Sequence, residues 1–139
     1  MRIMAIDYGD AHTGIAISDP TGFLAGFTTV INAYRPEAVA EQISALAKEH
    51  GVEELVLGHP INMDGTRGPR SEKAQAMKTL LEETTSLLVV LWDERRTTID
   101  AHQILMNSGK NAKKRKKVVD AVAATLILEG YLTYKTSHP

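Results

Sequence analysis

The sequence predicts an α/β protein with a mixed five-stranded sheet, antiparallel over its first three strands and then parallel, flanked by helices. Three apolar, strand-like segments with short links come first, which is typical of an antiparallel meander. Helical and strand-like segments then alternate, which indicates parallel strands covered by helices. We expect residues 1–139 to form a single domain, because 139 residues is the size of one ordinary domain.

The predicted elements follow from apolar spacing and turn signals. Strands are expected at residues 2–7, 14–19, 23–31, 54–58 and 87–92. A first helix begins at Pro36 and ends at Gly51, and a second covers residues 71–83. Thr97 opens a third helix with a capping box, and that helix runs through Met106. The remaining segments are a Gly- and Pro-rich loop at 59–70, a basic loop at 110–117 and a last helix at 118–131.

Composition excludes several classes of protein. The chain has no cysteine, which excludes a disulfide framework and a thiolate zinc site. No apolar run is long enough for a membrane span. We expect no export signal, because the first residues lack a basic region followed by an apolar stretch. We therefore expect a cytoplasmic protein with no membrane partner. The net charge of −1 hides six Lys and Arg side chains between Lys110 and Lys117, a cluster that can hold a polyanion.

Acidic residues stand at three places where burial is expected. Asp7 ends the first strand, and Asp93-Glu94 follows the last one directly. Asp120 shares a helix face with the apolar residues four, seven and eleven positions later. Ligands of α/β sheets collect at the carboxyl ends of strands, and an isolated buried carboxylate is costly. Clustered carboxylates without Cys or paired His indicate a hard cation, Mg²⁺ or Mn²⁺.

Each acid also has a purely structural interpretation. Asp7 could cap a helix or pair with an arginine, and Asp93-Glu94 could form a local ion-pair cluster with Arg95-Arg96. Asp120 could be an ordinary acid near a helix N-terminus. Together the three favour a metal site, in which two ions would activate a water and stabilise a leaving oxygen during phosphodiester hydrolysis.

Four sequence blocks resemble the signature blocks of the YqgF (RuvX) family. These are "DYGDAHTGIAISD", "LGHPINMDGTRGPR", "DERRTT" and "KRKKVVDAVAATLIL", in the family's order and spacing. The resemblance implies an RNase H-like fold related to RuvC and a metal-dependent nuclease. It implies maturation of the 5′ end of pre-16S rRNA or resolution of Holliday junctions. The catalytic and metal-binding acids carried over are Asp7, Glu94 and Asp120.

The middle acid needs a choice, because neighbouring residues of a strand point to opposite faces. The family pattern favours Glu94, and Asp93 is kept as a supporting or substitute ligand. Two positions depart from the pattern: His12-Thr13 replaces a basic and an aliphatic residue, and His59 replaces a leucine between Gly58 and Pro60. Neither departure touches the three acids.

Basic residues are expected to hold the nucleic-acid backbone beside the acids. Those predicted to do so are Arg67, Arg70, Arg95, Lys113, Lys114, Arg115 and Lys116. The expected partners are pre-rRNA or branched DNA, with ribosomal precursor particles as a further possibility. A resolvase cuts two strands symmetrically and needs a stable dimer. No dimerisation element stands out, so we expect a monomer or weak homodimer, which favours RNA processing.

Two other classes of function remain open. The first is an RNase H-like module that binds RNA without cutting it, against which the intact acid set argues. The second is an ATPase of the actin-like or sugar-kinase type, because "IDYGDAHTGIAISD" resembles the first phosphate loop of that superfamily. Such enzymes clamp nucleotide between two domains of this kind, and 139 residues supply one.

Overall fold

The framework of the protein is one mixed sheet with helices on both faces. The computed structural model describes residues 1–20, 25–59, 68–93 and 112–137, and within the last segment it describes side chains from 122 to 135. The strands are β1 (Arg2–Asp7), β2 (His12–Ser18), β3 (Ala25–Asn32), β4 (Val52–His59) and β5 (Leu88–Asp93). The helices are α1 (Pro36–His50), α2 (Pro69–Thr85) and α4 (Ala112–Ser137).

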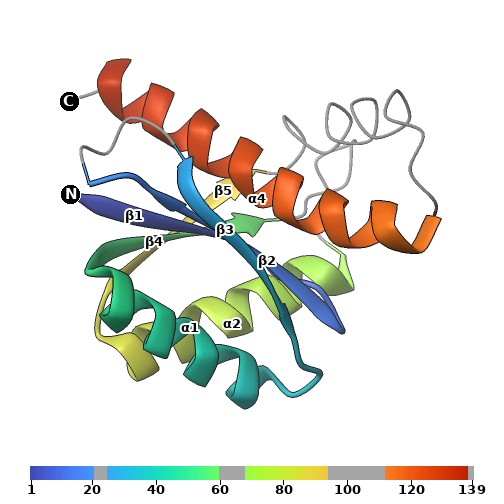
Figure 1. Cartoon of the computed structure of the whole chain (residues 1–139). Helices are drawn as coiled ribbons and strands as arrows, with labels where there is room; N and C mark the ends of the chain where they lie inside the picture. The colour runs from blue at the N-terminus through green and yellow to red at the C-terminus, as the bar shows by residue number, and fades with distance from the viewer. Residues whose placement is uncertain (21–24, 60–67, 94–111, 138–139) are drawn as a thin grey trace.

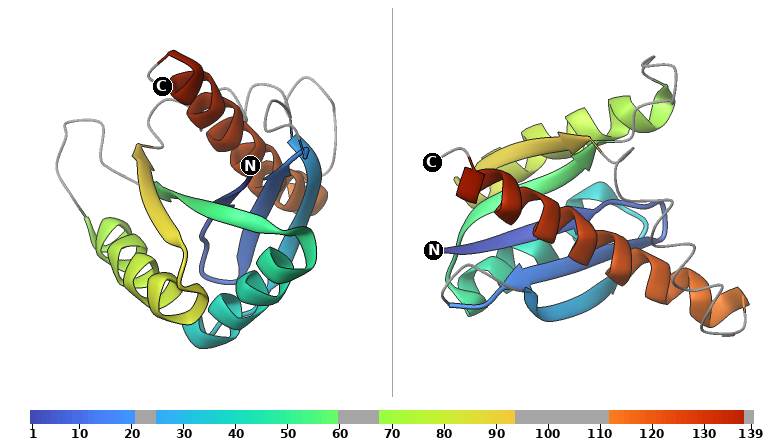
Figure 2. Two further views of the ribbon diagram at one scale, coloured as in Figure 1. Left: turned by 90° about the vertical axis from the view of Figure 1, so that its left-hand side faces the viewer. Right: turned by 90° about the horizontal axis from the view of Figure 1, so that it is seen from above.

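The order of strands across the sheet is β3-β2-β1-β4-β5 (Figure 1). β1, β2 and β3 pair antiparallel, whereas β1 pairs with β4 and β4 with β5 in parallel. The mixed sheet predicted from the sequence is therefore confirmed. Figure 2 shows the three layers: α1 and α2 cover one face, and α4 crosses the other.

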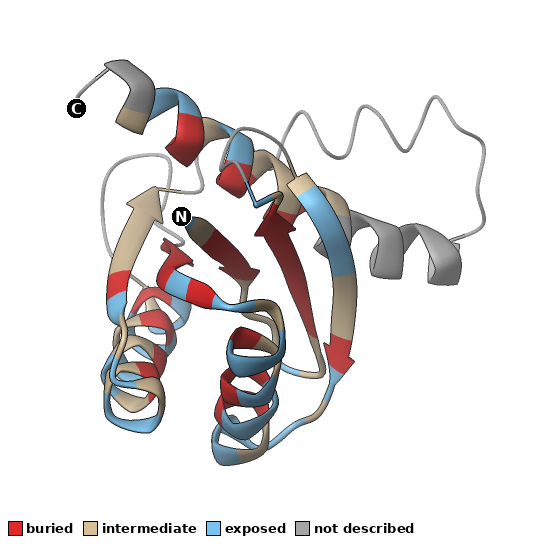
Figure 3. Cartoon of the chain, turned by 60° about the vertical axis from the view of Figure 1, so that its left-hand side comes forward, coloured by how far each residue is buried: buried red, intermediate tan, exposed pale blue. Residues whose placement is uncertain are grey.

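Two apolar clusters fill the spaces between these layers. The cluster beneath α1 and α2 includes Met4, Ile6, Leu55 and Leu57, and the cluster beneath α4 includes Ile3, Ala5 and Val56. Consecutive residues of β1 and β4 thus alternate between the two clusters, as side chains of a strand buried on both faces must. Burial is densest along the three central strands β2, β1 and β4 (Figure 3). This alternation also decides which face each residue at the strand ends takes.

Local sequence explains where α1 and α2 begin and end. Each has a proline in its first turn, where the missing N–H costs no helical hydrogen bond. Gly51 ends α1 in the left-handed conformation with φ 67°, which glycine adopts without a steric penalty. The predicted bounds of α1 are confirmed. α2 begins at Pro69 and ends at Thr85, two residues beyond the prediction at either end.

The predicted basic loop is wrong over residues 112–117, because α4 begins at Ala112 and not at residue 118. Alanine, lysine and arginine are strong helix formers, and repulsion between like charges on one helix face costs only about 0.2–0.5 kcal/mol per pair. The apolar stripe that marked the helix in the sequence starts after this basic segment, so it set the predicted boundary too late. α4 also continues past the predicted end, to Ser137.

Other strand ends differ less from the prediction. β2 begins at His12 rather than residue 14, and β5 includes Asp93. β4 extends through His59, which had been assigned to the following loop. The predicted helix at 97–106 and most of the predicted loop at 59–70 lie outside the described residues. No helix among the described segments, α4 included, combines the length and apolar character that a membrane crossing needs.

A buried polar cluster fixes the C-terminal part of α4 to the amino end of the sheet. The Tyr131 hydroxyl donates a hydrogen bond to the buried Glu54 carboxylate. The Lys135 ammonium lies 3.1 Å from the same carboxylate. Burial, followed by this hydrogen bond and the charge of Glu54, raises the pKa of Tyr131. The phenol therefore stays protonated as a donor throughout the neutral range.

Tyr131→Phe is expected to lower the free energy of unfolding by about 1–3 kcal/mol, because it removes a donor from a buried carboxylate. The folded-state pKa of Tyr131 is raised, so its contribution is complete below pH 10 and declines as the pH rises further. The stability gap between wild type and variant should therefore narrow from pH 8 to pH 11. Urea unfolding of both proteins at pH 8 and at pH 11 measures this difference in the free energy of unfolding. An equal or wider gap at pH 11 would contradict this role.

Candidate functional site

Three neighbouring parallel strands end in polar residues at one edge of the sheet. Asp7 is the last residue of β1, His59 of β4 and Asp93 of β5. The register pairs Ile6 with Leu57, and His59 with Asp93, so the three strands end at closely similar heights. We call this edge, defined by Asp7, His59 and Asp93, the carboxyl edge. It is where α/β folds of this kind bind ligands.

Alternation along β1 places Asp7 on the face covered by α4. Ile3 and Ala5 belong to the cluster beneath α4, whereas Met4 and Ile6 belong to the opposite cluster. Asp7 comes two residues after Ala5, so it lies on the same face of the sheet as Ile3 and Ala5. Its side chain is half-buried. A carboxylate that is partly withdrawn from water at a strand end fits a hard-cation ligand, because its oxygens are donors that Mg²⁺ and Mn²⁺ accept.

Asp93 takes the opposite face from Asp7. Val90 and Trp92 pack with the cluster beneath α4, and Val89 and Leu91 with the other. Asp93 therefore shares the face of His59 and α2. This geometry argues against Asp93 as a ligand of the same ion as Asp7. Glu94, the residue favoured by the family pattern, lies outside the described part of the chain.

The direction of α4 brings Asp120 toward the carboxyl edge. α4 runs opposite to β1 (Figure 1), and Tyr131 contacts Glu54, the register partner of Ile3. Eleven residues of helix separate Tyr131 from Asp120, about 16 Å. Four residues of strand separate Ile3 from Asp7, about 13 Å. The backbone at Asp120 therefore lies at roughly the same height as Asp7. Asp120 comes four and seven residues before Ala124 and Ile127, on the same side of the helix, and those two residues pack on the sheet.

His59 is a residue of this edge that sequence reasoning missed. Its ring lies buried, with Nε2 2.6 Å from the Ser71 hydroxyl in the first turn of α2. The Gln75 amide donates to that same hydroxyl at 3.2 Å. These contacts tie the start of α2 to the end of β4. The usable signal was the position of His59 directly after the buried run "ELVLG", which makes it a strand residue rather than part of a loop.

The turn after Asp7 has room only for glycine at position 9. A Cβ atom built on Gly9 would overlap the carbonyl oxygen of His12, a backbone atom that cannot swing away. The turn is thus compressed against the start of β2, whose Gly14 pairs with Asp7. Gly9 thereby fixes the course of the chain directly after the predicted catalytic acid.

The structure describes some of the predicted basic residues and not others. Arg70 lies exposed in the first turn of α2. The first turns of α4 include Lys113, Lys114, Arg115 and Lys116, of which the structure describes the backbone only. Arg67 and Arg95 lie outside the described residues. Among the side chains that the structure describes, no three His, Asp or Glu residues form a metal-binding group. Two of the three predicted ligands, Glu94 and Asp120, are not among those side chains.

Comparison with known sequences gives a family match over almost the whole chain. The model of a family described as RuvX, Holliday junction resolvase, matches residues 1–134. A curated protein of Halothermothrix orenii, named "Putative pre-16S rRNA nuclease", is 44% identical over 135 residues, covering 97% of this chain and 96% of that protein. A protein of the same name from Carboxydothermus hydrogenoformans is 41% identical over 138 residues and is covered in full.

Comparison with solved structures supports the fold. Thermus thermophilus RuvC in complex with a Holliday junction has a TM-score of 0.64 at 13% identity, and the match covers 99% of this chain and 97% of that one. A hexokinase of the ROK type from the same organism has a TM-score of 0.50 at 22% identity, over 74% of this chain but 38% of the kinase. The RuvC match over both full lengths, together with the strand order, confirms the RNase H-like class.

Proposed function

Because this chain belongs to the RuvX family, whose members are nucleic-acid hydrolases, we propose that it cleaves precursor 16S rRNA at its 5′ end with Asp7, Glu94 and Asp120. The observation that carries the proposal is the half-buried Asp7 at the carboxyl edge, on the face covered by α4. The course of α4 supports Asp120 as the second acid. The opposite face taken by Asp93 supports Glu94 as the third.

The three acids would hold one or two Mg²⁺ or Mn²⁺ ions through carboxylate oxygens. A bound divalent ion supplies an activated water for attack on phosphorus and stabilises the sugar oxygen that leaves as its bond to phosphorus breaks. The protein's own part is to hold the carboxylates in a fixed arrangement. β1 and the compressed turn at Gly9 do so for Asp7, and the packed apolar face of α4 would do so for Asp120.

Basic residues would hold the RNA backbone against this edge. Arg70 is exposed at the start of α2, which His59 and Ser71 fix to the strand ends. Lys113, Lys114, Arg115 and Lys116 lie in the first turns of α4, in the part of the helix that points toward the carboxyl edge. Arg67 and Arg95 complete the proposed set. The substrate would be a precursor particle or free leader RNA in the cytoplasm. The protein would bind it as a monomer or weak homodimer.

Resolution of Holliday junctions is the second candidate. The family description and the RuvC–junction complex favour it. It requires two active sites related by a dimer axis, because two strands must be cut symmetrically. The relatives named for pre-16S rRNA favour the first candidate.

Cleavage of two labelled substrates by the purified protein separates these candidates. One is the 5′ leader of precursor 16S rRNA, the other a four-way DNA junction, each with Mg²⁺, Mn²⁺ or EDTA. We expect discrete cuts in the leader with either metal, none in EDTA, and no paired symmetric cuts in the junction. Symmetric junction cleavage with an intact leader would move the function to recombination.

A further inference from the structure

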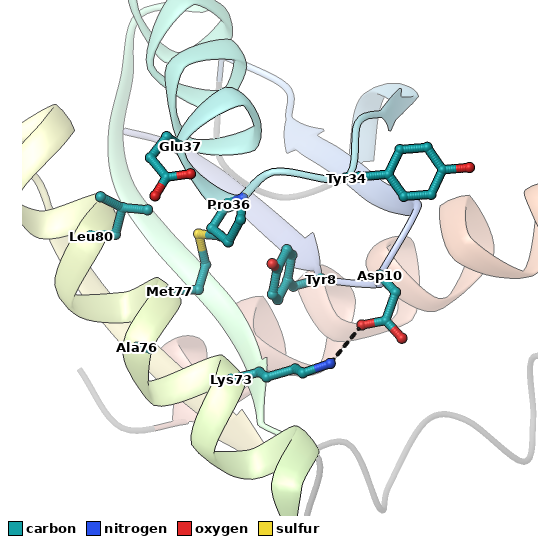
Figure 4. Close-up of a pocket in the computed structure, with 9 residues that line it drawn as sticks. All are labelled: Tyr8, Asp10, Tyr34, Pro36, Glu37, Lys73, Ala76, Met77 and Leu80. Atoms are coloured by element: carbon teal, nitrogen blue, oxygen red, sulfur yellow. Dashed lines mark hydrogen bonds and ion pairs between the residues drawn. The ribbon is translucent and has the colours of Figure 1, made fainter.

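A pocket lies beside the carboxyl edge on the face opposite to that of Asp7. It has a volume of about 390 Å³ and lies between the β1–β2 turn, the start of α1 and the middle of α2 (Figure 4). Tyr8 stands at its centre, with Met77 and Glu37 on one side of it and Tyr34 on the other. Its size falls in the range of small-molecule sites, roughly 300–1,000 Å³. The function described above leaves this pocket unused.

The aromatic side chains of the pocket suit a planar ligand. Tyr8 is half-buried, whereas Tyr34 is 80% exposed. The ring of Tyr8 inside the pocket offers a face on which another ring can stack, and unpaired bases of RNA are commonly held in this way. The buried Met77 adds a polarisable apolar wall. The pocket therefore favours a flat, partly apolar group over a hydrated ion.

The charges of the pocket disfavour a phosphate and favour N–H donors. Two carboxylates line it, Asp10 and Glu37, against one ammonium group, Lys73. Lys73 is already engaged by Asp10 at 3.0 Å. The pocket lining therefore carries one carboxylate more than it carries ammonium groups. A nucleobase edge with N–H groups can donate to the exposed Glu37 carboxylate, whereas a phosphate would be repelled.

The pocket adjoins the predicted cleavage site through consecutive residues of one strand end. Asp7 and Tyr8 are neighbours in the chain and take opposite faces of the sheet. A nucleic-acid strand crossing the carboxyl edge can thus place a phosphate at Asp7 while a nearby base of the same strand enters on the other face. We propose that the pocket binds one unpaired nucleobase of the substrate, stacked on the central ring of Tyr8 and donating N–H hydrogen bonds to Glu37. This rests on the proposed RNA substrate and adds that the substrate is unpaired next to the cut.

Guanine fits this description best, because its N1–H and N2–H₂ groups lie side by side and can both face one carboxylate. A base inside a duplex has those groups engaged and its faces stacked, so it must leave the helix to enter. The pocket would therefore select precursor RNA with a bulged or single-stranded residue near the cut, and discriminate against continuous duplex.

Binding in EDTA tests the inference without requiring cleavage. The probes are three short, labelled, blunt RNA duplexes: one with a single bulged guanosine, one with an abasic residue at the bulge, and one fully paired. We expect wild type to bind the bulged guanosine about 5- to 100-fold more tightly than either control, the range that base stacking on an aromatic residue provides. Tyr8→Ala should abolish this ratio, Tyr8→Phe should retain it, and Glu37→Gln should reduce it.

The matched control is Tyr134→Ala, which removes an exposed tyrosine of α4 away from the pocket and should leave the ratio at its wild-type value. Equal binding of all three duplexes by wild type, or an unchanged ratio in Tyr8→Ala, would overturn the inference. Failure of the proposed nuclease function would appear elsewhere, as absence of metal-dependent cleavage, and would leave the binding ratio intact.

Discussion

Asp7→Asn should lower the rate of RNA cleavage by at least about 100-fold while leaving RNA affinity within about twofold of wild type. The amide keeps the size of the carboxylate but loses the charge that a hard cation requires. Removing a residue that only supports a metal ligand typically lowers metal affinity or activity by about 10- to 100-fold. Loss of a direct ligand should therefore lower activity by at least as much. The rest of the edge, including the His59–Ser71 contact, stays in place.

Single-turnover cleavage gives the cleavage rate and equilibrium binding gives the RNA affinity, both measured on the same leader RNA. Glu53→Gln is the matched control, because Glu53 is an exposed acid at the start of β4, at the opposite end of the sheet. It should cleave at the wild-type rate. If Asp7→Asn cleaved as fast as this control, Asp7 would not be a ligand.

Gly9→Ala is expected to reduce cleavage by about 10- to 100-fold, and to lower the free energy of unfolding by about 1–3 kcal/mol. The added methyl group would overlap the His12 carbonyl oxygen, so the turn must open. Overpacking of this kind typically costs that much stability. Opening the turn also displaces the chain directly after Asp7, and a shift of about 1 Å at a catalytic group can cost about 100-fold in rate.

Gly51→Ala is the matched control for that substitution. Gly51 needs its left-handed conformation, yet open space surrounds the position of its Cβ. It ends α1 and precedes the start of β4, at the end of the sheet opposite to the carboxyl edge. We expect it to lose about 1 kcal/mol of stability and to keep full cleavage activity. Equal rates for wild type and Gly9→Ala would show that the turn does not position Asp7.

The strand and helix order could be read from the sequence because its signals are local. Apolar runs such as "LVLG" and "LLVVLW" are long enough for buried strands, and Pro36 and Gly51 mark helix ends whose chemistry depends on few neighbours. The boundary at Ala112 failed for the opposite reason. Charge suggested a loop, but helix propensity continues through lysine and arginine, and the apolar stripe begins later.

A residue of the candidate site could be predicted from the sequence only where its own position in the chain marked it out. Asp7 interrupts an apolar strand, and the structure places it at the carboxyl edge. The pairing of His59 with Ser71 joins residues on two elements, so neither position indicates it alone. The choice between Asp93 and Glu94 depends on where β5 ends and which face its last residue takes. That information comes from the register with β4, which no local pattern contains.

The pocket around Tyr8 and Tyr34 was invisible to the sequence for a related reason. Its walls come from the β1–β2 turn, α1 and α2, and each residue taken alone resembles ordinary surface or core. The Lys73–Asp10 contact joins residues 63 positions apart. Only the packing of α1 and α2 against the same face of the sheet brings these side chains together.

The most direct test of the central claim compares metal-dependent cleavage rates of the acid variants on one leader RNA. The account predicts that Glu94→Gln and Asp120→Asn fall to the level of Asp7→Asn. It predicts that the Asp7→Asn/Asp120→Asn double variant falls little further, because ligands of one site act as a unit, and that Asp93→Asn keeps most of its activity. An inactive Asp93→Asn beside a fully active Glu94→Gln would contradict the assignment of faces and, with it, the proposed site.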